Sequence, residues 1–156
     1  MQIALIALAI AFALAAGYAL VLRSGKRYRE LSWAQIFFDQ ATWTALVYVT
    51  GGAASGASSL YGLTVVTGAV VSGLTGAAIA AVVGYVFYIS LSLMMIARWI
   101  PVPSDQLDVP YALTLEQAAS PLALNLLVIT VVTLLSGYLA ERLRLTGGKL
   151  EEVTER

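Results

Sequence analysis

Residues 53–100 contain a single charged side chain, Arg98, close to the end of the stretch. A helix of about 48 residues would be about 72 Å long, whereas the hydrocarbon core of a bilayer is about 30 Å thick. The stretch is therefore too long for one span and predicts two helices joined by a break. Residues 72–76, which read SGLTG, are the best break. They predict helices over residues 58–71 and 76–99, with a re-entrant segment over 58–71 as the alternative.

The composition is that of an integral membrane protein, because 60% of the residues are hydrophobic and only 12% are charged. Further apolar runs predict spans over residues 3–22, 31–50 and 120–140. The expected fold is therefore all-α: a polytopic transmembrane helix bundle of about five spans over residues 1–141. Residues 142–156 are predicted to begin a cytoplasmic amphipathic or coiled-coil helix.

Charge placement predicts the orientation of these spans. Basic residues follow the first run at positions 23–29 and the last run at positions 142–149. The charged residues of the loop over residues 101–117 are all acidic. Five spans place both basic segments on the cytoplasmic side, which the positive-inside rule favours, whereas four spans would separate them. No positive charge precedes the first run, so we expect a retained span rather than a cleaved signal. The N-terminus is then outside and the C-terminus cytoplasmic.

The end of the chain carries apolar residues at heptad spacing, with Leu143 and Leu150 at one core position and Leu139 and Val153 at the other. Two heptads are few, and a helix this short is marginal in water without a partner. A coiled coil and a solvated, fraying tail are equally compatible with this pattern.

Small residues recur every four positions, as in the row Ala69, Gly73, Ala77 and Ala81. Such rows allow helices to approach closely in lipid. Packing within one chain is the favoured interpretation of any single row, and the interface of a homodimer is the alternative.

Chemistry is sharply restricted, because the chain has no cysteine and no histidine. Disulfides, the usual zinc sites and haem ligation by histidine are thereby excluded. Among the polar residues within the predicted spans, three are singled out as intramembrane polar sites, namely Asp39, Gln40 and Asn125. An intramembrane acid is costly and often functional, although Asp39 could also lie at the interface and face water. We find no catalytic constellation, no metal or cofactor site and no sign of nucleic-acid binding, so we expect no enzyme activity in this chain.

Several segments together resemble a known family, and they cover nearly the whole chain: residues 39–52, 55, 59–61, 124–127 and 135–144. The most specific are VYVTGG at residues 47–52 and SGYLAERLR at residues 136–144. They resemble the membrane sensor region of bacterial sensor histidine kinases, of the type that regulates type IV pilus genes, and of its nitrogen-regulation relatives.

The resemblance implies a dimeric six-span bundle in the bacterial inner membrane that passes a signal through its last helix to a cytoplasmic kinase core. This chain departs from the pattern in showing five spans and in having no histidine to phosphorylate. We therefore expect a sensor region without its kinase core, in which displacement of the last helix carries the signal.

We expect the signal to pass along the last helix through six consecutive or neighbouring residues, with Gly137 as the weak point: Gly137, Tyr138, Leu139, Glu141, Arg142 and Leu143. No loop is long enough to form a folded binding domain, so the stimulus would come from the lipid bilayer, another membrane protein or the bundle itself. A structural subunit of a membrane complex is the main alternative. An oligomeric small transporter, with Asp39 and Asn125 lining its path, is a third possibility.

Overall fold

The computed structural model describes residues 28–104, 106–107 and 109–154, together with residues 5–6, 9–10, 12–13 and 16–17. For residues 28–31 and 147–154 it describes the backbone only. Most of the predicted span over residues 3–22, the basic residues Arg23, Lys26 and Arg27, and the side chains of Leu150 and Val153 lie outside this description.

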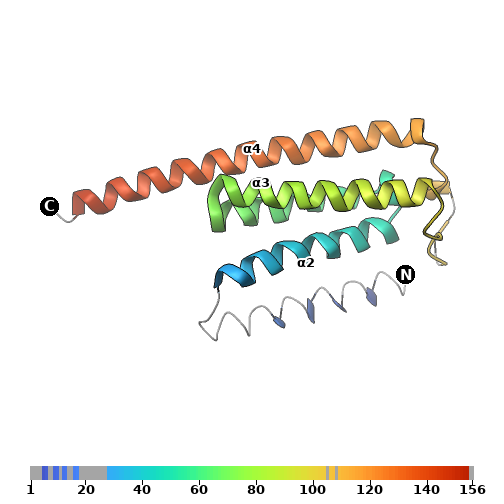
Figure 1. The fold of residues 1–156 in the computed structure, drawn as a ribbon, viewed down its shortest axis with the longest axis horizontal. Coiled ribbons are helices and arrows are strands. Elements are labelled where there is room, and N and C mark those ends of the chain that lie inside the picture. Colours follow the sequence, from blue (N-terminus) through green and yellow to red (C-terminus); the bar gives the residue numbers. More distant parts are fainter. Residues whose placement is uncertain are drawn as a thin grey trace.

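Helices account for all the regular structure in the described part of the chain (Figure 1). The elements, in order, are α2 (Tyr28–Val49), the short 3-10 helices η1 (Gly52–Ala54) and η2 (Gly56–Leu60), α3 (Tyr61–Ile96), η3 (Val109–Tyr111) and α4 (Leu115–Thr154). The all-α prediction is confirmed for these residues.

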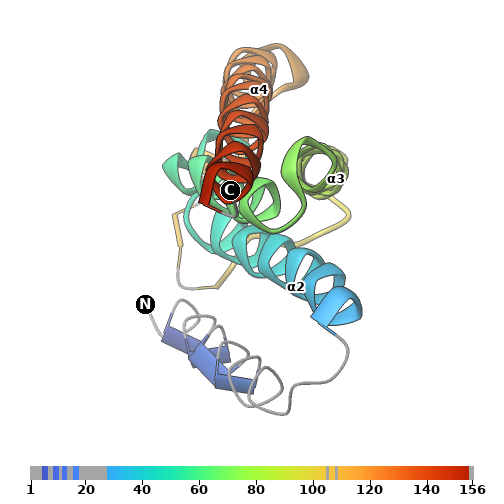
Figure 2. The same ribbon diagram turned by 90° about the vertical axis from the view of Figure 1, so that its left-hand side faces the viewer.

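Helix α3 folds back on itself at Gly73, whose backbone is non-helical with φ 65° and ψ −149°. The rings of Tyr61 and Tyr88, on either side of this point, lie 5.7 Å apart between centroids. A straight helix would hold them about 40 Å apart. Residues 61–72 (the short arm) and 74–96 (the long arm) are therefore antiparallel, and Figure 2 shows them side by side, joined by a loop. The reversal falls within the break predicted at residues 72–76.

Small residues allow the two arms to meet at backbone distance. A Cβ atom added to Gly68 would lie 2.6 Å from the carbonyl oxygen of Gly76 and 3.3 Å from the Cβ of Ala80. Ala69, Ala77 and Ala80 are buried as well. The small-residue row thus packs within the chain, which was the favoured of its two interpretations.

Helix α4 packs on both arms. It runs antiparallel to the long arm, since Tyr85 and Thr130 share a hydrogen bond of 2.5 Å and Leu74 lies beside Gly137. It runs parallel to the short arm, since Gly62 lies beside Val132 at one level and the carbonyl of Val71 accepts from Arg144 at the other. Helix α2 completes the bundle against the short arm, where Trp43 donates to Thr64 at 2.9 Å.

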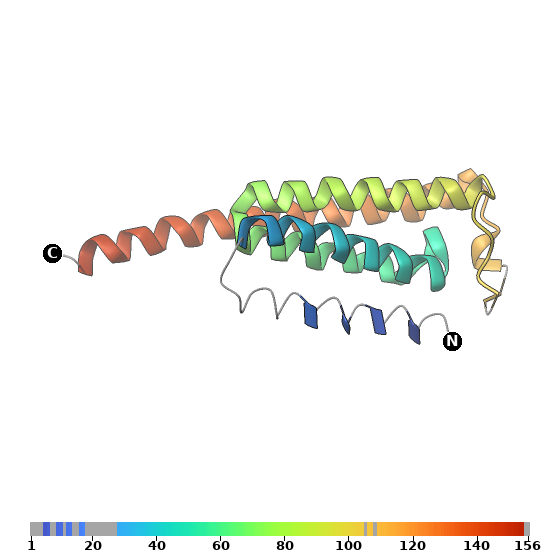
Figure 3. The same ribbon diagram turned by 60° about the horizontal axis from the view of Figure 1, so that its bottom comes forward.

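The two ends of the bundle differ. At one end, which we call the loop end, the turn at Gly51 lies beside Pro110 and Gly52 lies beside Tyr111. At the other, which we call the hairpin end, the reversal at Gly73 lies beside Arg144. Helix α4 continues past the hairpin end as a single helix (Figure 3).

Two described helical segments are long and apolar enough to cross a membrane, Gly56–Ile96 and Leu115–Thr146. Only 11% of the most apolar window of the second is buried in the bundle, and the exposed side chains of α4 include Leu124, Leu127 and Leu134. The prediction of about five spans is not supported. The predicted spans 58–71 and 76–99 fall in one helix that reverses at Gly73, and the short arm is about 18 Å long at the helical rise.

Helix α2, predicted as the span over residues 31–50, is not among these two segments. Its polar side chains lower its hydropathy, and they include Gln35, Asp39, Gln40, Thr42 and Thr44.

The reversal gives a direct test of the fold. A side chain at Gly73 would be held in a backbone conformation that is nearly exclusive to glycine, and its Cβ would lie 3.0 Å from the Arg144 guanidinium. Gly73→Ala should therefore lower the free energy of unfolding by about 1–3 kcal/mol in a denaturation titration in mixed micelles. Gly56→Ala is the matched control, because no atom lies within 4 Å of its added Cβ. Equal stability of the two variants would contradict the reversal.

Candidate functional site

A group of buried and partly buried polar side chains joins the helices inside the bundle. We call it the polar junction, and its members are Gln40 and Thr44 of α2, Tyr61 and Tyr88 of the two arms of α3, and Asn125 of α4. Gln40, Tyr61 and Tyr88 are all 0% exposed. Every helix of the bundle contributes to this junction.

Hydrogen bonds connect these side chains across helices. The Tyr61 hydroxyl shares a bond of 2.7 Å with Thr44. The Tyr88 hydroxyl donates to the carbonyl of Ala53 at 2.8 Å and accepts from the Asn125 amide at 3.0 Å. Tyr88 therefore ties the long arm to η1 and to α4 at once. Such buried polar bonds specify one arrangement of the helices, since other packings would leave the same groups without partners.

Gln40 fills the space that Gly84 leaves open. Its Nε2 atom donates to the carbonyl of Ala80 at 2.8 Å, and a Cβ at Gly84 would lie 3.0 Å from it. Its Oε1 atom is buried and accepts no hydrogen bond from the described residues. The Gln40 Oε1 atom therefore loses its contact with water without gaining a hydrogen bond from the described residues, so its burial costs free energy.

The three predicted intramembrane polar residues lie in different surroundings. Gln40 and Asn125 both enter the polar junction. Asp39 is half-buried and bonds with Gln35, one turn earlier on its own helix. No hydrogen bond in the described part of the chain joins Asp39 to Asn125, which bonds instead with Tyr88 and with the carbonyl of Pro121.

Tyr61 and Tyr88, which make the central bonds of the junction, are not among the site residues predicted from the sequence. Each lies in an apolar run where an aromatic residue is unremarkable, and they meet only because α3 reverses. If the residues on either side of the break at 72–76 are aligned as an antiparallel pair, Tyr61 and Tyr88 fall next to each other.

A second feature is the crossing of α4 over the hairpin end, where Gly137 faces Leu74. A Cβ at Gly137 would collide with the Leu74 side chain and lie 3.3 Å from its Cα. Helix α4 is continuous through Gly137, which stays the predicted weak point of the last helix. The glycine also permits close contact between α4 and the start of the long arm.

Arg144 makes the second contact at this crossing. Its guanidinium donates to the carbonyl of Val71 at 3.3 Å, next to the reversal. It therefore satisfies a carbonyl at the C-terminal end of the short arm, where helical carbonyls lack partners within their own helix. Sequence reasoning placed Arg144 only in the basic segment and missed this role, because the contact joins residues far apart in the chain.

The other predicted transmission residues are all exposed: Tyr138, Leu139, Glu141, Arg142 and Leu143. Arg142 donates through Nε to the Tyr138 hydroxyl at 2.8 Å and lies 5.4 Å from the centroid of that ring. These residues are thus available to a partner, while Gly137 and Arg144 contact the hairpin.

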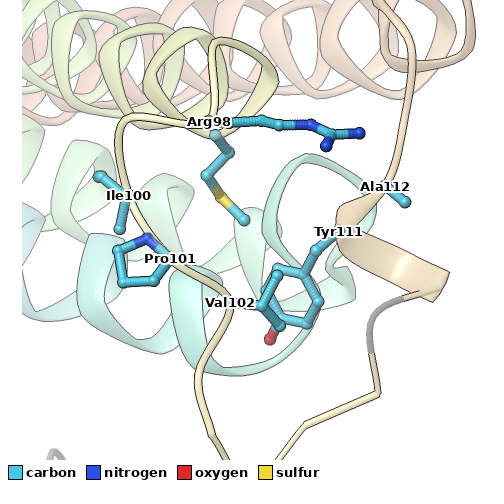
Figure 4. Close-up of a pocket in the computed structure, with 7 residues that line it drawn as sticks. Arg98, Ile100, Pro101, Val102, Tyr111 and Ala112 are labelled. Carbon is cyan, nitrogen blue, oxygen red and sulfur yellow. The ribbon is translucent and has the colours of Figure 1, made fainter.

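A cavity of about 370 Å³ opens at the loop end (Figure 4). Its walls include Met95, Val102 and Tyr111, and the side chain of Arg98 extends across it toward Ala112. Arg98 has a left-handed backbone with φ 57°, which is uncommon for a residue with a side chain. The volume is in the range of small-molecule sites, about 300–1,000 Å³. In the described part of the chain no cluster of acidic, histidine or cysteine residues could hold a metal ion.

No protein-family model, no curated protein and no solved structure matches this chain. The geometry of the bundle therefore carries the functional argument.

The polar junction is testable by a double-mutant cycle of Tyr88→Phe and Asn125→Leu. Because the two side chains bond directly, each single substitution breaks the same bond, and the cycle should give a coupling free energy of about 0.6–1.7 kcal/mol. Unfolding titrations of the wild type, both single variants and the double variant provide the measurement.

Tyr48→Phe paired with Asn125→Leu is the control cycle. Tyr48 donates to the carbonyl of Pro101 at the bundle surface and makes no bond to Asn125, so its effect should simply add. Additivity in the Tyr88 cycle as well would show that the junction bond contributes nothing.

Proposed function

We propose that this chain is the transmembrane sensory and signal-transmitting region of a sensor histidine kinase, as its sequence resemblance implies. One observation supports this most: α4 contacts both arms of α3 inside the bundle and then continues past it without interruption. A helix placed in this way can carry a change in bundle packing to whatever is attached beyond the bundle.

The proposed mechanism is a displacement of α4 against the hairpin. Tyr88 and Asn125 hold α4 toward the loop end, and Gly137 and Arg144 hold it at the hairpin end. A stimulus that changes the contacts at either level shifts α4 by a slide or a rotation. Because the exposed residues from Tyr138 to Leu143 belong to the same rigid helix, they move with it. A homodimer would bring two such helices together.

In the proposed placement, the bundle lies in the bacterial inner membrane with its hairpin end on the cytoplasmic side. The basic residues Arg142, Arg144 and Lys149 are then inside and the loop end is outside, as the positive-inside rule favours. The outward-facing apolar surface of α4 would contact lipid tails.

Cysteine labelling can check this orientation, since the natural chain has no cysteine. Gly56→Cys and Ser104→Cys lie at exposed positions of the loop end and should react with a membrane-impermeant maleimide in intact cells. Thr75→Cys, exposed at the hairpin end, should react only after permeabilisation. The reverse pattern, or labelling of all three in intact cells, would reject the proposed topology.

Signal transmission can be tested in a fusion of the full chain, through α4, to a histidine kinase core. Gly137→Leu forces α4 away from Leu74 and should change basal autophosphorylation at least twofold, a change of about 0.4 kcal/mol in the balance of states. Leu134→Phe adds bulk on an exposed face of the same helix and should leave the activity unchanged. Unchanged activity in both variants would instead favour a structural subunit of a membrane complex.

A further inference from the structure

A groove of about 320 Å³ runs between the short arm of α3 and α4, next to the hairpin end. Val66, Ala69 and Val70 line it from the short arm, and Leu139, Leu143 and Arg144 line it from α4. The wall is almost wholly apolar along its length. Its one cation, Arg144, belongs to the last turn of α4 that contacts the bundle.

The parallel packing of the two helices creates this groove. They touch at Gly62 and Val132 and again at Val71 and Arg144. Between these contacts the facing positions include Ala69 and Ala140, whose small side chains leave space. The lining residues of α4 extend from Ser136 to Arg144, a rise of about 12 Å.

The Arg144 guanidinium has more hydrogen-bond donors than it uses in the contacts described above. A guanidinium carries five N–H donors, and one hydrogen bond of Arg144 is found, the bond to the carbonyl of Val71. Among the described residues no acidic side chain pairs with it. A cation in this position, at the end of an apolar groove, is complementary to a molecule with an anionic head and a hydrocarbon tail.

We propose that this groove binds an anionic phospholipid, with part of one acyl chain between the short arm and α4 and the phosphate on the Arg144 guanidinium. The inference rests on the proposed membrane placement, in which the hairpin end lies at the cytoplasmic surface. There the groove opens to lipid tails, and Arg144 reaches the level of the head groups.

Such a lipid would act directly on the contact that links α4 to the hairpin. The phosphate and the Val71 carbonyl accept from the same guanidinium, so phosphate binding weakens the bond of 3.3 Å between α4 and the short arm. The acyl chain at the same time lies between Val70 and Leu143, which line opposite walls of the groove. The content of anionic lipid in the membrane thereby becomes a stimulus for the proposed sensor.

The matched pair Arg144→Gln and Arg142→Gln tests the proposal on the full chain. Each variant removes one positive charge from α4, but only Arg144 lines the groove, whereas Arg142 engages Tyr138. In nanodiscs of mixed phosphatidylglycerol and phosphatidylcholine, native mass spectrometry counts the lipids retained by the protein. Arg144→Gln should lower the preference for phosphatidylglycerol about fivefold, which is the effect of roughly 1 kcal/mol per basic residue near the surface. Arg142→Gln should keep the preference of the wild type.

Equal losses in both variants would mean general attraction of the basic segment for anionic lipid, and no loss in either would mean that no anion binds at Arg144. Each result overturns the proposal. Ala140→Phe fills the groove and leaves Arg144 in place, so it should lower the retention of phosphatidylglycerol as well. Retention at the wild-type level in this variant would exclude an acyl chain from the groove.

Failure here is distinguishable from failure of the proposed function. Lipid retention is measured on the isolated chain, whereas signal transmission is measured by the effect of Gly137→Leu in the kinase fusion. A fusion that responds to Gly137→Leu without any lipid preference would reject the lipid site alone.

Discussion

The bundle depends on the reversal of α3 at Gly73, where the chain adopts a backbone conformation that a side chain would strain. Two further glycines, Gly68 and Gly76, then let the antiparallel arms touch at backbone distance. Only in this arrangement do Tyr61 and Tyr88 become neighbours. Three glycines, Gly68, Gly73 and Gly76, thus determine how the two arms pack against each other.

Helix α4 is held by contacts of two different kinds at its two levels. Near the loop end, Asn125 contributes to a hydrogen-bonded junction in a medium of low polarity, where unpaired groups are costly. At the hairpin end, close packing at Gly137 and a single bond from Arg144 hold the same helix. The hydrogen bonds at Asn125 fix one position of α4, because any other position would leave buried polar groups without partners. The contacts at the hairpin end involve fewer polar groups and constrain α4 less. Motion of α4 is therefore expected at the hairpin end, where the proposed lipid site lies.

Sequence reasoning reached the helical class and the break at residues 72–76, because a long uncharged stretch and a glycine-rich interruption are local signals. It also singled out Gln40 and Asn125 as polar residues within predicted spans. It missed Tyr88 as the partner of Asn125, and the bond from Arg144 to Val71, since both contacts join distant segments. Its count of about five spans is not supported, because the predicted spans 58–71 and 76–99 fall in one helix that reverses at Gly73.

The parallel packing of α4 on the short arm has a consequence for biogenesis. Both arms of α3 leave the ribosome before α4, and antiparallel arms joined by a tight reversal can insert together as a hairpin. Helix α4 emerges after them, and its contacts come from both arms: Tyr88 and Leu74 of the long arm and Val71 of the short arm. The helix proposed to carry the signal therefore reaches its full set of contacts only once the hairpin has formed.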